Sequence, residues 1–334
     1  MKYISIIIPI LNEKNYIENC LISVLKSDYS KEKMEILLID GGSDDGTLEI
    51  IQKFQEEFSF IKLLRNPKKI VPISMNIGIK EAKGDYIIRL DAHADYPVNY
   101  FSKLIEWHQK LDADNVGTTI VTKVKNKTLK ANSIKEILSH KFGVGDSDFR
   151  TGIKDVKEVD TVPFGCYKKE VFEKYGLYDE RLVRNQDIEL NKRIINGGGK
   201  IYLIPDVQCT YYARENFKAL AKNNFSNGYW NILTAYYTKT LNSLSLRHFI
   251  PLIFLLMLVL PLIFSFFIPK FIYVTLLSLG SYLALVIMTS LKVREENNSF
   301  YYLVGSFFTL HFSYGFGSLV GIFFLLGNYI KGDR

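Results

Sequence analysis

Three long apolar segments close the sequence, and they constrain the fold more than any other feature. Residues 249–268 and 271–291 contain no charged side chain, and residues 300–330 contain one histidine and no Asp, Glu, Lys or Arg. A helix of about 20 apolar residues is long enough to cross a hydrocarbon core of about 30 Å. Three such segments in succession are difficult to bury in a soluble fold of this size, so we expect a membrane protein.

The third segment does not fit a single upright span. Its 31 residues would form a helix of about 46 Å, which is too long for one span and too short for two. Gly315, Gly317 and Gly321 lie near its middle, so a kink, a re-entrant turn and a strong tilt all remain open. Lys292 and Arg294 favour a cytoplasmic loop before this segment. We predict a multi-pass plasma-membrane protein whose large N-terminal domain is cytoplasmic.

The part of the chain before these segments has the composition of a soluble protein. The net charge of the whole chain is only +7 and no block of like charge stands out, so no nucleic-acid partner is expected. Cys20, Cys166 and Cys209 are far apart and odd in number. This spacing supports neither a disulfide framework nor a zinc site, and it favours buried thiols in a reducing compartment.

Apolar runs of strand length alternate with segments of helical periodicity in the first 90 residues. The predicted strands are 3–10, 34–40, 60–65 and 85–90, and the predicted helices are 13–27, 47–58 and 70–84. Strands that are apolar on both faces and separated by helices indicate a mostly parallel, Rossmann-like sheet covered on both sides. The fold class is therefore α/β, followed by transmembrane helices.

Polar side chains stand where several of these strands end. Asn12 and Glu13 follow the first strand, Asp40 ends the second, and Asp91 follows the fourth, with His93 two positions later. Ligands bind beyond the carboxyl ends of the strands in such sheets. Ordinary turns are also polar, but two Asp residues that abruptly end apolar strands are more than turns require. We therefore expect one crevice that binds a ligand.

Four stretches carry a resemblance to a known family. They are SIIIPILNE, LLIDGGSDDGT, MNIGIKEAKGDYIIRLDAHADYP and VPFGCYKKEVFEKYGLYDERLVRNQDIELNKRI. In this order they resemble glycosyltransferase family 2, the inverting enzymes of the GT-A fold, over roughly residues 3 to 205. The chain looks most like the succinoglycan-type exopolysaccharide glucosyltransferases. The resemblance implies a catalytic domain over 1–212, an interfacial amphipathic region over 213–248 and a transmembrane region over 249–330.

The resemblance also implies a donor site. Its nucleotide-sugar-binding residues would be Pro9, Asn12, Glu13, Asp40, Asn76 and Asp91. Asp40 would bind the uracil, although Gly41 stands where the family often has a second Asp. Asp91 and His93 occupy the DxD position and would hold a divalent metal on the diphosphate of a UDP-sugar. Oxygen ligands suit Mg²⁺ or Mn²⁺, and an imidazole favours Mn²⁺.

On the acceptor side, the resemblance makes Asp187 the general base. It opens a predicted helix, where a carboxylate is electrostatically favoured. Glu189 would hold Arg193 or a backbone amide. Gln186 replaces an acidic residue of the family pattern. The remaining acceptor-side candidates are Phe164, Gly165, Cys166 and Arg214.

These features predict an inverting transferase that moves one sugar from a UDP-sugar, UDP-glucose or a similar hexose donor, to a polyprenyl-diphosphate-linked glycan. The process would be exopolysaccharide, capsule or other cell-surface polysaccharide synthesis. No Gln-x-x-Arg-Trp element precedes Trp230, which favours transfer of one sugar per encounter. Two alternatives stay open: direct transfer to polyprenyl phosphate, and an inactive sugar-nucleotide-binding scaffold.

Overall fold

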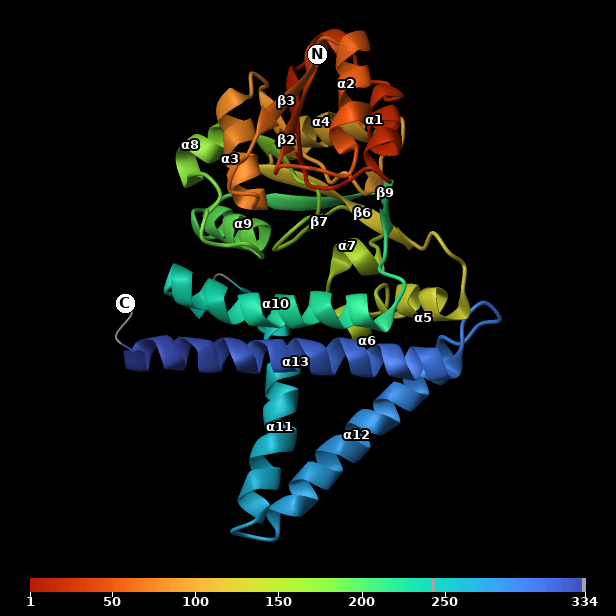
Figure 1. Ribbon diagram of the computed structural model, residues 1–334, viewed down its shortest axis with the longest axis vertical. Coiled ribbons are helices and arrows are strands. Elements are labelled where there is room, and N and C mark those ends of the chain that lie inside the picture. The colour runs from red at the N-terminus through yellow and green to blue at the C-terminus, as the bar shows by residue number, and fades with distance from the viewer. Residues whose placement is uncertain (242–243, 332–334) are drawn as a thin grey trace. The chain divides into compact units, whose positions relative to one another are not determined.

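The computed structural model describes residues 1–241 and 244–331, and it divides the chain into two compact units (Figure 1). The first unit contains residues 1–121 and 148–212. The second contains residues 122–147 together with everything from Ala213 onward. The predicted boundary after residue 212 thus coincides with a boundary between units. Residues 122–147, which the sequence analysis placed in the catalytic domain, belong to the second unit.

The first unit is built on a mixed β-sheet. Its strands follow the spatial order β3-β2-β1-β4-β8-β6-β9-β5, and β7 pairs with β9. The strands β1 to β4 are mutually parallel, whereas β8 runs antiparallel to β4 and β6. Their bounds are β1 Ile4–Ile10, β2 Met34–Asp40, β3 Ile61–Arg65, β4 Tyr86–Arg89, β5 Ala94–Asp95, β6 Asn115–Lys123, β7 Lys157–Glu158, β8 Cys166–Lys168 and β9 Ile201–Tyr212.

Helices cover both faces of this sheet, because side chains alternate along each central strand. In β1, Ile6 and Ile8 pack into one hydrophobic cluster and Ile7 packs into the other, and all three are fully buried. The first cluster includes residues of α1, α2 and α4, and the second includes residues of α3, α8 and α9. The helices are α1 Ile17–Leu25, α2 Thr47–Glu57, α3 Val71–Glu81, α4 Tyr100–Leu111, α7 Asp148–Thr151, α8 Glu170–Tyr175 and α9 Gln186–Asn196, with a 3-10 turn η1 at Lys31–Lys33. The predicted α/β architecture is confirmed.

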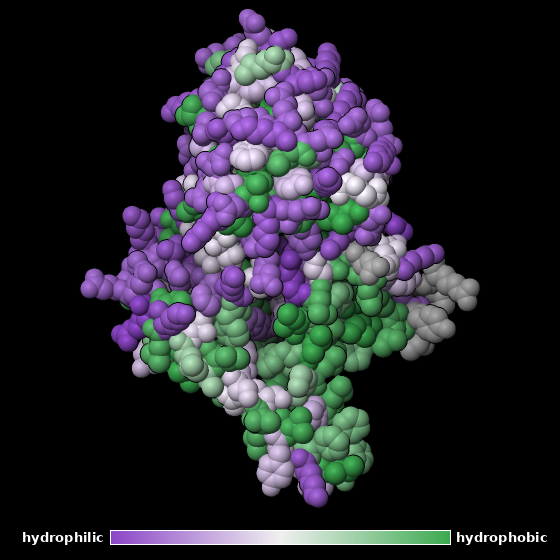
Figure 2. All heavy atoms as spheres, turned by 180° about the vertical axis from the view of Figure 1, so that it is seen from behind, coloured by the Kyte–Doolittle hydropathy of each residue, from purple (hydrophilic) through white to green (hydrophobic). Residues whose placement is uncertain are grey.

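The second unit is helical. It contains α5 Leu129–Ile137, α6 Lys141–Val144, α10 Phe217–Thr238, η3 Leu246–His248, α11 Ile250–Ser265, α12 Phe271–Lys292 and α13 Phe300–Lys331. Two of these helices, α12 and α13, are long and apolar enough to cross a membrane, and α11 is a shorter apolar helix of 16 residues. The third apolar segment forms one continuous helix, α13, not a re-entrant turn (Figure 1). Apolar side chains gather on the surface of the second unit, whereas the surface of the first is mainly hydrophilic (Figure 2).

Candidate active site

The loops that follow β1 and β2 are joined by hydrogen bonds at the carboxyl edge of the sheet. The parallel register pairs Ile10 with Asp40, so the two loops leave the sheet side by side. The backbone N–H of Asn12 donates to Ser43 Oγ at 2.9 Å, and the N–H of Glu13 donates to Thr47 Oγ1 at 2.8 Å. Asn12 has a left-handed backbone with φ of 59°, a conformation that Asn tolerates better than most residues. Three predicted donor-side residues, Asn12, Glu13 and Asp40, therefore lie along one rim at the carboxyl edge of the sheet.

Asp40 is buried and shapes the turn after β2. Its carboxylate accepts hydrogen bonds from the N–H of Gly42 at 2.8 Å and from the N–H and hydroxyl of Ser43 at 3.0 and 2.7 Å. Gly42 has φ of 90°, which glycine adopts without steric cost. Binding of uracil by Asp40 stays a prediction, and a bound base would share the carboxylate with these turn donors.

The guanidinium of Arg89, the last residue of β4, lies between two carboxylates that are distant in the sequence. One terminal nitrogen lies 3.4 Å from Asp91 Oδ1, and the other lies 3.5 Å from Asp187 Oδ2. Asp187 stands in the first turn of α9, which begins directly after Asn185 in a left-handed conformation. Arg89 thus brings the predicted donor-side carboxylate and the predicted base into one cluster.

Arg89 is a site residue that the sequence analysis missed. Its side chain is 12% exposed, and burial alone would lower its pKa. The charges of Asp91 and Asp187 outweigh burial, so the pKa of Arg89 is raised and the guanidinium keeps its charge. The signal was present in the sequence, since an arginine inside the apolar run YIIRL requires an anionic partner when the strand is buried.

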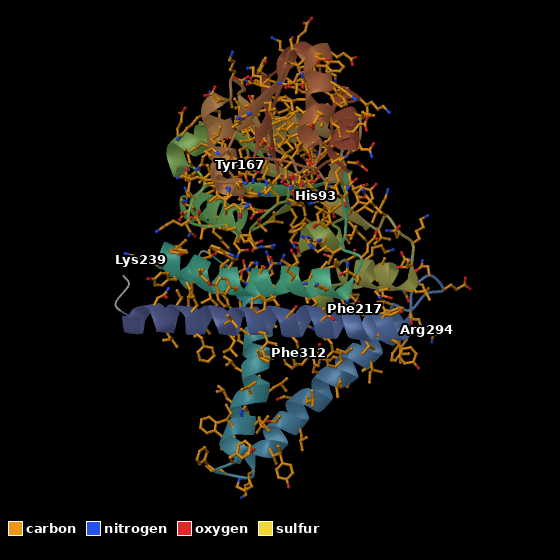
Figure 3. The ribbon with its side chains drawn as sticks, in the orientation of Figure 1. His93, Tyr167, Phe217, Lys239, Arg294 and Phe312 are labelled. Carbon is orange, nitrogen blue, oxygen red and sulfur yellow. The ribbon has the colours of Figure 1, made fainter. Side chains whose placement is uncertain are left out.

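His93 lies in the short loop between Asp91 and β5 (Figure 3). Its Nδ1 is 3.7 Å from Glu13 Oε1, and its ring meets the rings of Tyr16 and Tyr211 edge to face. Burial lowers the pKa of His93, but the nearby carboxylates of Glu13 and Asp91 outweigh it and raise the pKa to about 9. The raised pKa favours the protonated imidazole, which must lose its proton before it can bind a metal ion.

The residues present fit a metal that arrives with a nucleotide, not a metal held by protein alone. Within the part of the chain that the structure describes, no group of three or more His, Cys, Asp or Glu side chains is placed to hold a metal ion. Magnesium-type sites on phosphates typically use one or two carboxylates, with the other ligands from phosphate and water. Asp91 is one quarter exposed, and its contact with Arg89 is long. Asp91 and His93 fit that smaller role once His93 has lost its proton.

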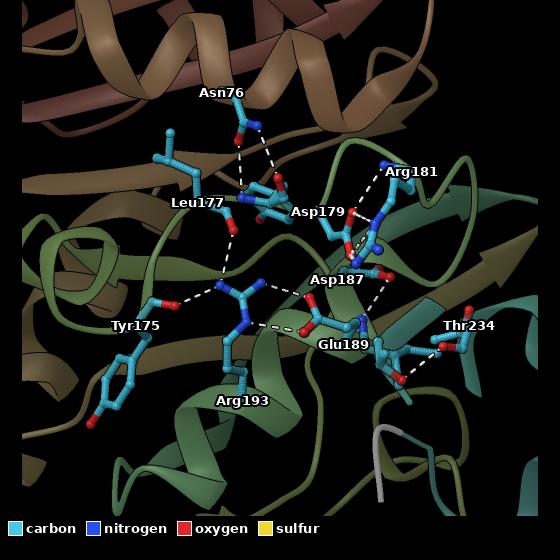
Figure 4. A network of polar contacts seen from close by, with 12 residues as sticks. Asn76, Tyr175, Leu177, Asp179, Arg181, Asp187, Glu189, Arg193 and Thr234 are labelled. Atoms are coloured by element: carbon cyan, nitrogen blue, oxygen red, sulfur yellow. Dashed lines mark hydrogen bonds and ion pairs between the residues drawn. The ribbon is translucent and has the colours of Figure 1, made fainter. Parts of the chain in front are cut away.

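Several predicted site residues hold α9 and the loop before it in place (Figure 4). Arg193 donates to both carboxylate oxygens of Glu189, at 3.0 and 2.6 Å, and to the backbone carbonyls of Tyr175 and Leu177. Two partners were expected for Glu189, Arg193 and a backbone amide, and the structure shows Arg193. These bonds fasten α9 to the chain segment that follows α8.

The amide of Asn76 has a related positioning role. Its oxygen accepts from the N–H of Tyr178 at 2.9 Å, and its nitrogen donates to the carbonyl of Tyr178 at 2.9 Å and to Glu180 Oε1 at 3.1 Å. The side chain is 4% exposed. In this arrangement Asn76 fastens the loop that precedes α9 to α3, so any contribution to donor binding would be through the position of that loop.

The stretch Phe164-Gly165-Cys166 leads into β8, and its two side chains are buried in the core. The carbonyl of Gly165 accepts the N–H of Arg89 at 3.0 Å, and a methyl group at Gly165 would lie 2.6 Å from Asn115 Oδ1. The Phe164 and Cys166 side chains therefore pack in the core, and an acceptor role for this stretch stays a prediction. Gln186 is also buried, and Arg214 is an exposed residue of the second unit.

Comparison with known proteins gives three kinds of similarity. A family model described as "Glycosyl transferase family 2" matches residues 5–176. The sequence is 34% identical over 249 residues to a Methanococcus voltae protein, covering 70% of this chain and 77% of the other. That protein is named dolichyl N-acetyl-alpha-D-glucosaminyl phosphate 3-beta-D-2,3-diacetamido-2,3-dideoxy-beta-D-glucuronosyltransferase. The sequence is also 32% identical over 225 residues to the succinoglycan biosynthesis protein ExoA of Rhizobium meliloti, covering 67% of each chain.

A solved structure shares the fold. The mannosyltransferase PcManGT from Pyrobaculum calidifontis, solved with GDP-Man and Mn²⁺, superposes with a TM-score of 0.59 at 14% sequence identity. The match covers 96% of this chain and 87% of that one.

Proposed function

Because this chain belongs to glycosyl transferase family 2, we propose that it transfers one sugar from a UDP-sugar to a polyprenyl-linked glycan at a membrane. The chain is a glycosyltransferase that uses a sugar nucleotide, as its family implies. The names of the two relatives support a cell-surface or lipid-carried glycan as the product. Two C-terminal helices long and apolar enough to cross a membrane support membrane attachment. We place the catalytic domain on the cytoplasmic side of the plasma membrane.

The reaction would be a single displacement at the anomeric carbon. The acceptor hydroxyl oxygen forms the new bond to that carbon while the bond to the diphosphate oxygen breaks. Asp187 accepts the hydroxyl proton on a carboxylate oxygen. Its side chain is one third exposed and accepts the backbone N–H of Ile188 at 3.0 Å, so it is both oriented and accessible to an acceptor.

On the donor side, Asp91 and Arg89 would orient the sugar diphosphate. Asp91 and His93 are the residues that would hold the divalent metal, Mn²⁺ or Mg²⁺. When bound, such an ion offsets the negative charge that develops on the leaving diphosphate. Asn12, Glu13 and Asp40 supply the rim at which the nucleoside would bind.

The observation that carries this proposal is the placement of Asp91 and Asp187 on opposite sides of the Arg89 guanidinium, at 3.4 and 3.5 Å. A transferase needs a donor-side group and a base within reach of the same reacting carbon. Residues from β4 and from α9 meet in this way here. The contacts are long for ion pairs, so both carboxylates keep oxygen lone pairs available for substrates.

The test is the replacement Asp187→Asn, which keeps the shape of the side chain and removes its basicity. We expect the rate of transfer to fall by about 100- to 10,000-fold, with the affinity for UDP-sugar near normal. Asp179→Asn is the matched control, because Asp179 lies in the same loop region and binds Arg181, not Arg89. Equal loss of transfer and donor affinity in Asp187→Asn would contradict the role of Asp187 as a base.

A second candidate is transfer directly to polyprenyl phosphate. The Methanococcus voltae relative is named for a sugar that is already carried on dolichyl phosphate, which favours a glycosylated lipid as acceptor. Comparing polyprenyl phosphate, a polyprenyl-phosphate sugar and a polyprenyl-diphosphate sugar as acceptors separates these alternatives. Transfer to the bare lipid phosphate alone would establish the second candidate.

A further inference from the structure

The helices α10 and α13 lie side by side along most of their length (Figure 1). The rings of Phe217 and Tyr302 lie 6.2 Å apart near the start of both helices. Further along, Gly317 faces the backbone of Phe225, and Gly321 faces Ile232. Contacts therefore advance in the same direction on both helices, so the pair is parallel.

Glycine residues allow the two backbones of this pair to touch. A methyl group at Gly228 would overlap the carbonyl oxygen of Tyr314, and one at Gly317 would overlap the carbonyl oxygen of Phe225. Ser318 Oγ also donates to the carbonyl of Gly228 at 3.1 Å. Small residues that bring helix backbones together give tight packing in a membrane environment. The pair should therefore act as one rigid layer.

This layer carries charged and amide groups that a membrane-spanning pair could not accommodate. Lys218 and Lys222 of α10 are exposed, and the same helix contains Asn223, Asn224, Asn227 and Asn231. Charged and amide side chains are strongly disfavoured at the centre of a bilayer. If α13 crossed the bilayer, its partner α10 would carry its asparagines into the hydrocarbon, and its two lysines, in the first two turns, would have to reach the interface.

The exposed face of α13 is nevertheless apolar. Phe316, Val320, Phe323 and Phe324 are between 43% and 62% exposed, and they recur at the spacing of one helix face. A helix pair with lysines on one member and an apolar stripe on the other has the character of a layer in the membrane interface.

The hairpin of α11 and α12 has a different character. Exposed apolar side chains occur along both helices, with Met257 51%, Leu277 72% and Met288 67% exposed. Residues 249–268 and 271–291 contain no charge. The 22 residues of α12 extend about 33 Å and the 16 residues of α11 about 24 Å, so the uncharged residues after Ser265 would complete the crossing on the α11 side. Both helices lead away from α13 (Figure 1), and Phe312 of α13 packs against Phe254 and Tyr282 of the hairpin (Figure 3).

We propose that the second unit binds the bilayer as a surface layer with one crossing hairpin. The pair α10–α13 lies in the plane of the interface, with the apolar stripe of α13 in contact with acyl chains. The hairpin α11–α12 crosses the bilayer and exposes Lys270 on the far side. Both ends of α13 then lie on the side of Arg294, although α13 is long enough to cross. This proposal does not depend on the donor, the acceptor or the catalytic residues.

The test uses three single-cysteine variants of the full chain in sealed vesicles: Lys270→Cys, Glu296→Cys and Gly327→Cys. All three positions have room for the new side chain, since Lys270 and Glu296 are exposed and a methyl group at Gly327 would meet no atom within 4 Å. The native cysteines are buried, and labelling of the unsubstituted protein measures their background. A membrane-impermeant maleimide is added first to intact vesicles and then after detergent.

We expect Gly327→Cys and Glu296→Cys to be labelled from one face of the membrane and Lys270→Cys from the other. Labelling of Gly327→Cys from the face of Lys270→Cys would show that α13 crosses and would overturn the proposal. Labelling of all three from one face would show that the hairpin does not cross, and would overturn it as well.

A depth measurement checks the orientation of α13 independently. Phe316→Trp and Phe323→Trp are introduced separately after Trp107 and Trp230 are replaced by Phe. The two positions are separated by seven residues, or about 10 Å along a helix axis. Lipids brominated at different depths should quench both tryptophans with the same depth profile if α13 lies in the interface. Profiles displaced by about 10 Å would contradict the proposal.

Discussion

Two arginines in the first unit bind carboxylates of the same helix, α9, in different ways. Arg193 makes bidentate hydrogen bonds of 3.0 and 2.6 Å to Glu189 and also donates to two backbone carbonyls. Arg89 is divided between Asp91 and Asp187 at 3.4 and 3.5 Å. The Arg193 cluster uses its donors internally, whereas the two carboxylates of the Arg89 cluster contact the guanidinium only at long distance. We therefore expect the pair with saturated hydrogen bonds, Arg193–Glu189, to serve stability and the Arg89 cluster to serve the reaction.

Removal of Arg89 should have the largest effect on activity. Arg89→Met leaves Asp91 and Asp187 without the cation between them, so mutual repulsion should displace one or both. Loss of one preorganised charged donor typically lowers kcat by about 100- to 1,000-fold. Arg89→Lys should restore part of the rate, because it returns the charge but cannot reach both carboxylates with the same geometry. An unchanged kcat in Arg89→Met would show that the cluster is incidental.

Removal of Arg193 should instead reduce stability. Arg193→Met leaves the buried Glu189 and the half-buried carbonyls of Tyr175 and Leu177 without their donor. A buried group left unsatisfied costs about 1–3 kcal/mol. We expect a lower thermal unfolding midpoint in detergent, with kcat per folded molecule within a few-fold of the original. A loss of kcat as large as that of Arg89→Met, without loss of stability, would remove the distinction between the two arginines.

The contact between His93 and Glu13, at 3.7 Å, is long, like the contacts of Arg89 with its two carboxylates. We expect His93→Ala to raise the Mn²⁺ concentration for half-maximal activity, since loss of a group around a metal costs about 10- to 100-fold in affinity. Isothermal titration with UDP, in Mn²⁺ and then in EDTA, separates metal binding from nucleotide binding. The same response to Mn²⁺ in both proteins would exclude His93 as a ligand.

The sequence predicted the sheet well because the apolar runs of β1, β2 and β4 are buried on both faces. It did not predict that Asn76 would bind a distant loop, because the partner Tyr178 is brought near only by folding. Arg89 was missed since its second partner, Asp187, belongs to another element. Length and hydropathy alone could not predict that α13 packs along α10, because this packing depends on the glycine contacts between the two helices.

A third arginine–carboxylate pair tests whether saturated hydrogen bonds alone determine how much a substitution destabilises the protein. Arg181 donates to both oxygens of Asp179, at 3.0 and 2.7 Å, but the arginine side chain is 58% exposed. The hydrogen bonds from Arg181 lower the pKa of Asp179. Solvent screens such a pair, so Asp179→Asn should cost only about 0–1 kcal/mol of stability near pH 7.

The sign of the pH dependence follows from that lowered pKa. The folded protein binds fewer protons at Asp179 than the unfolded chain does, so the stabilisation is present above the ordinary Asp pKa of about 4. It is lost as the pH falls through the lower folded value. Thermal midpoints of the original and Asp179→Asn proteins should therefore differ slightly at pH 7 and converge in acid. A constant difference across this range would assign the effect of Asp179 to the geometry of its loop and not to its charge.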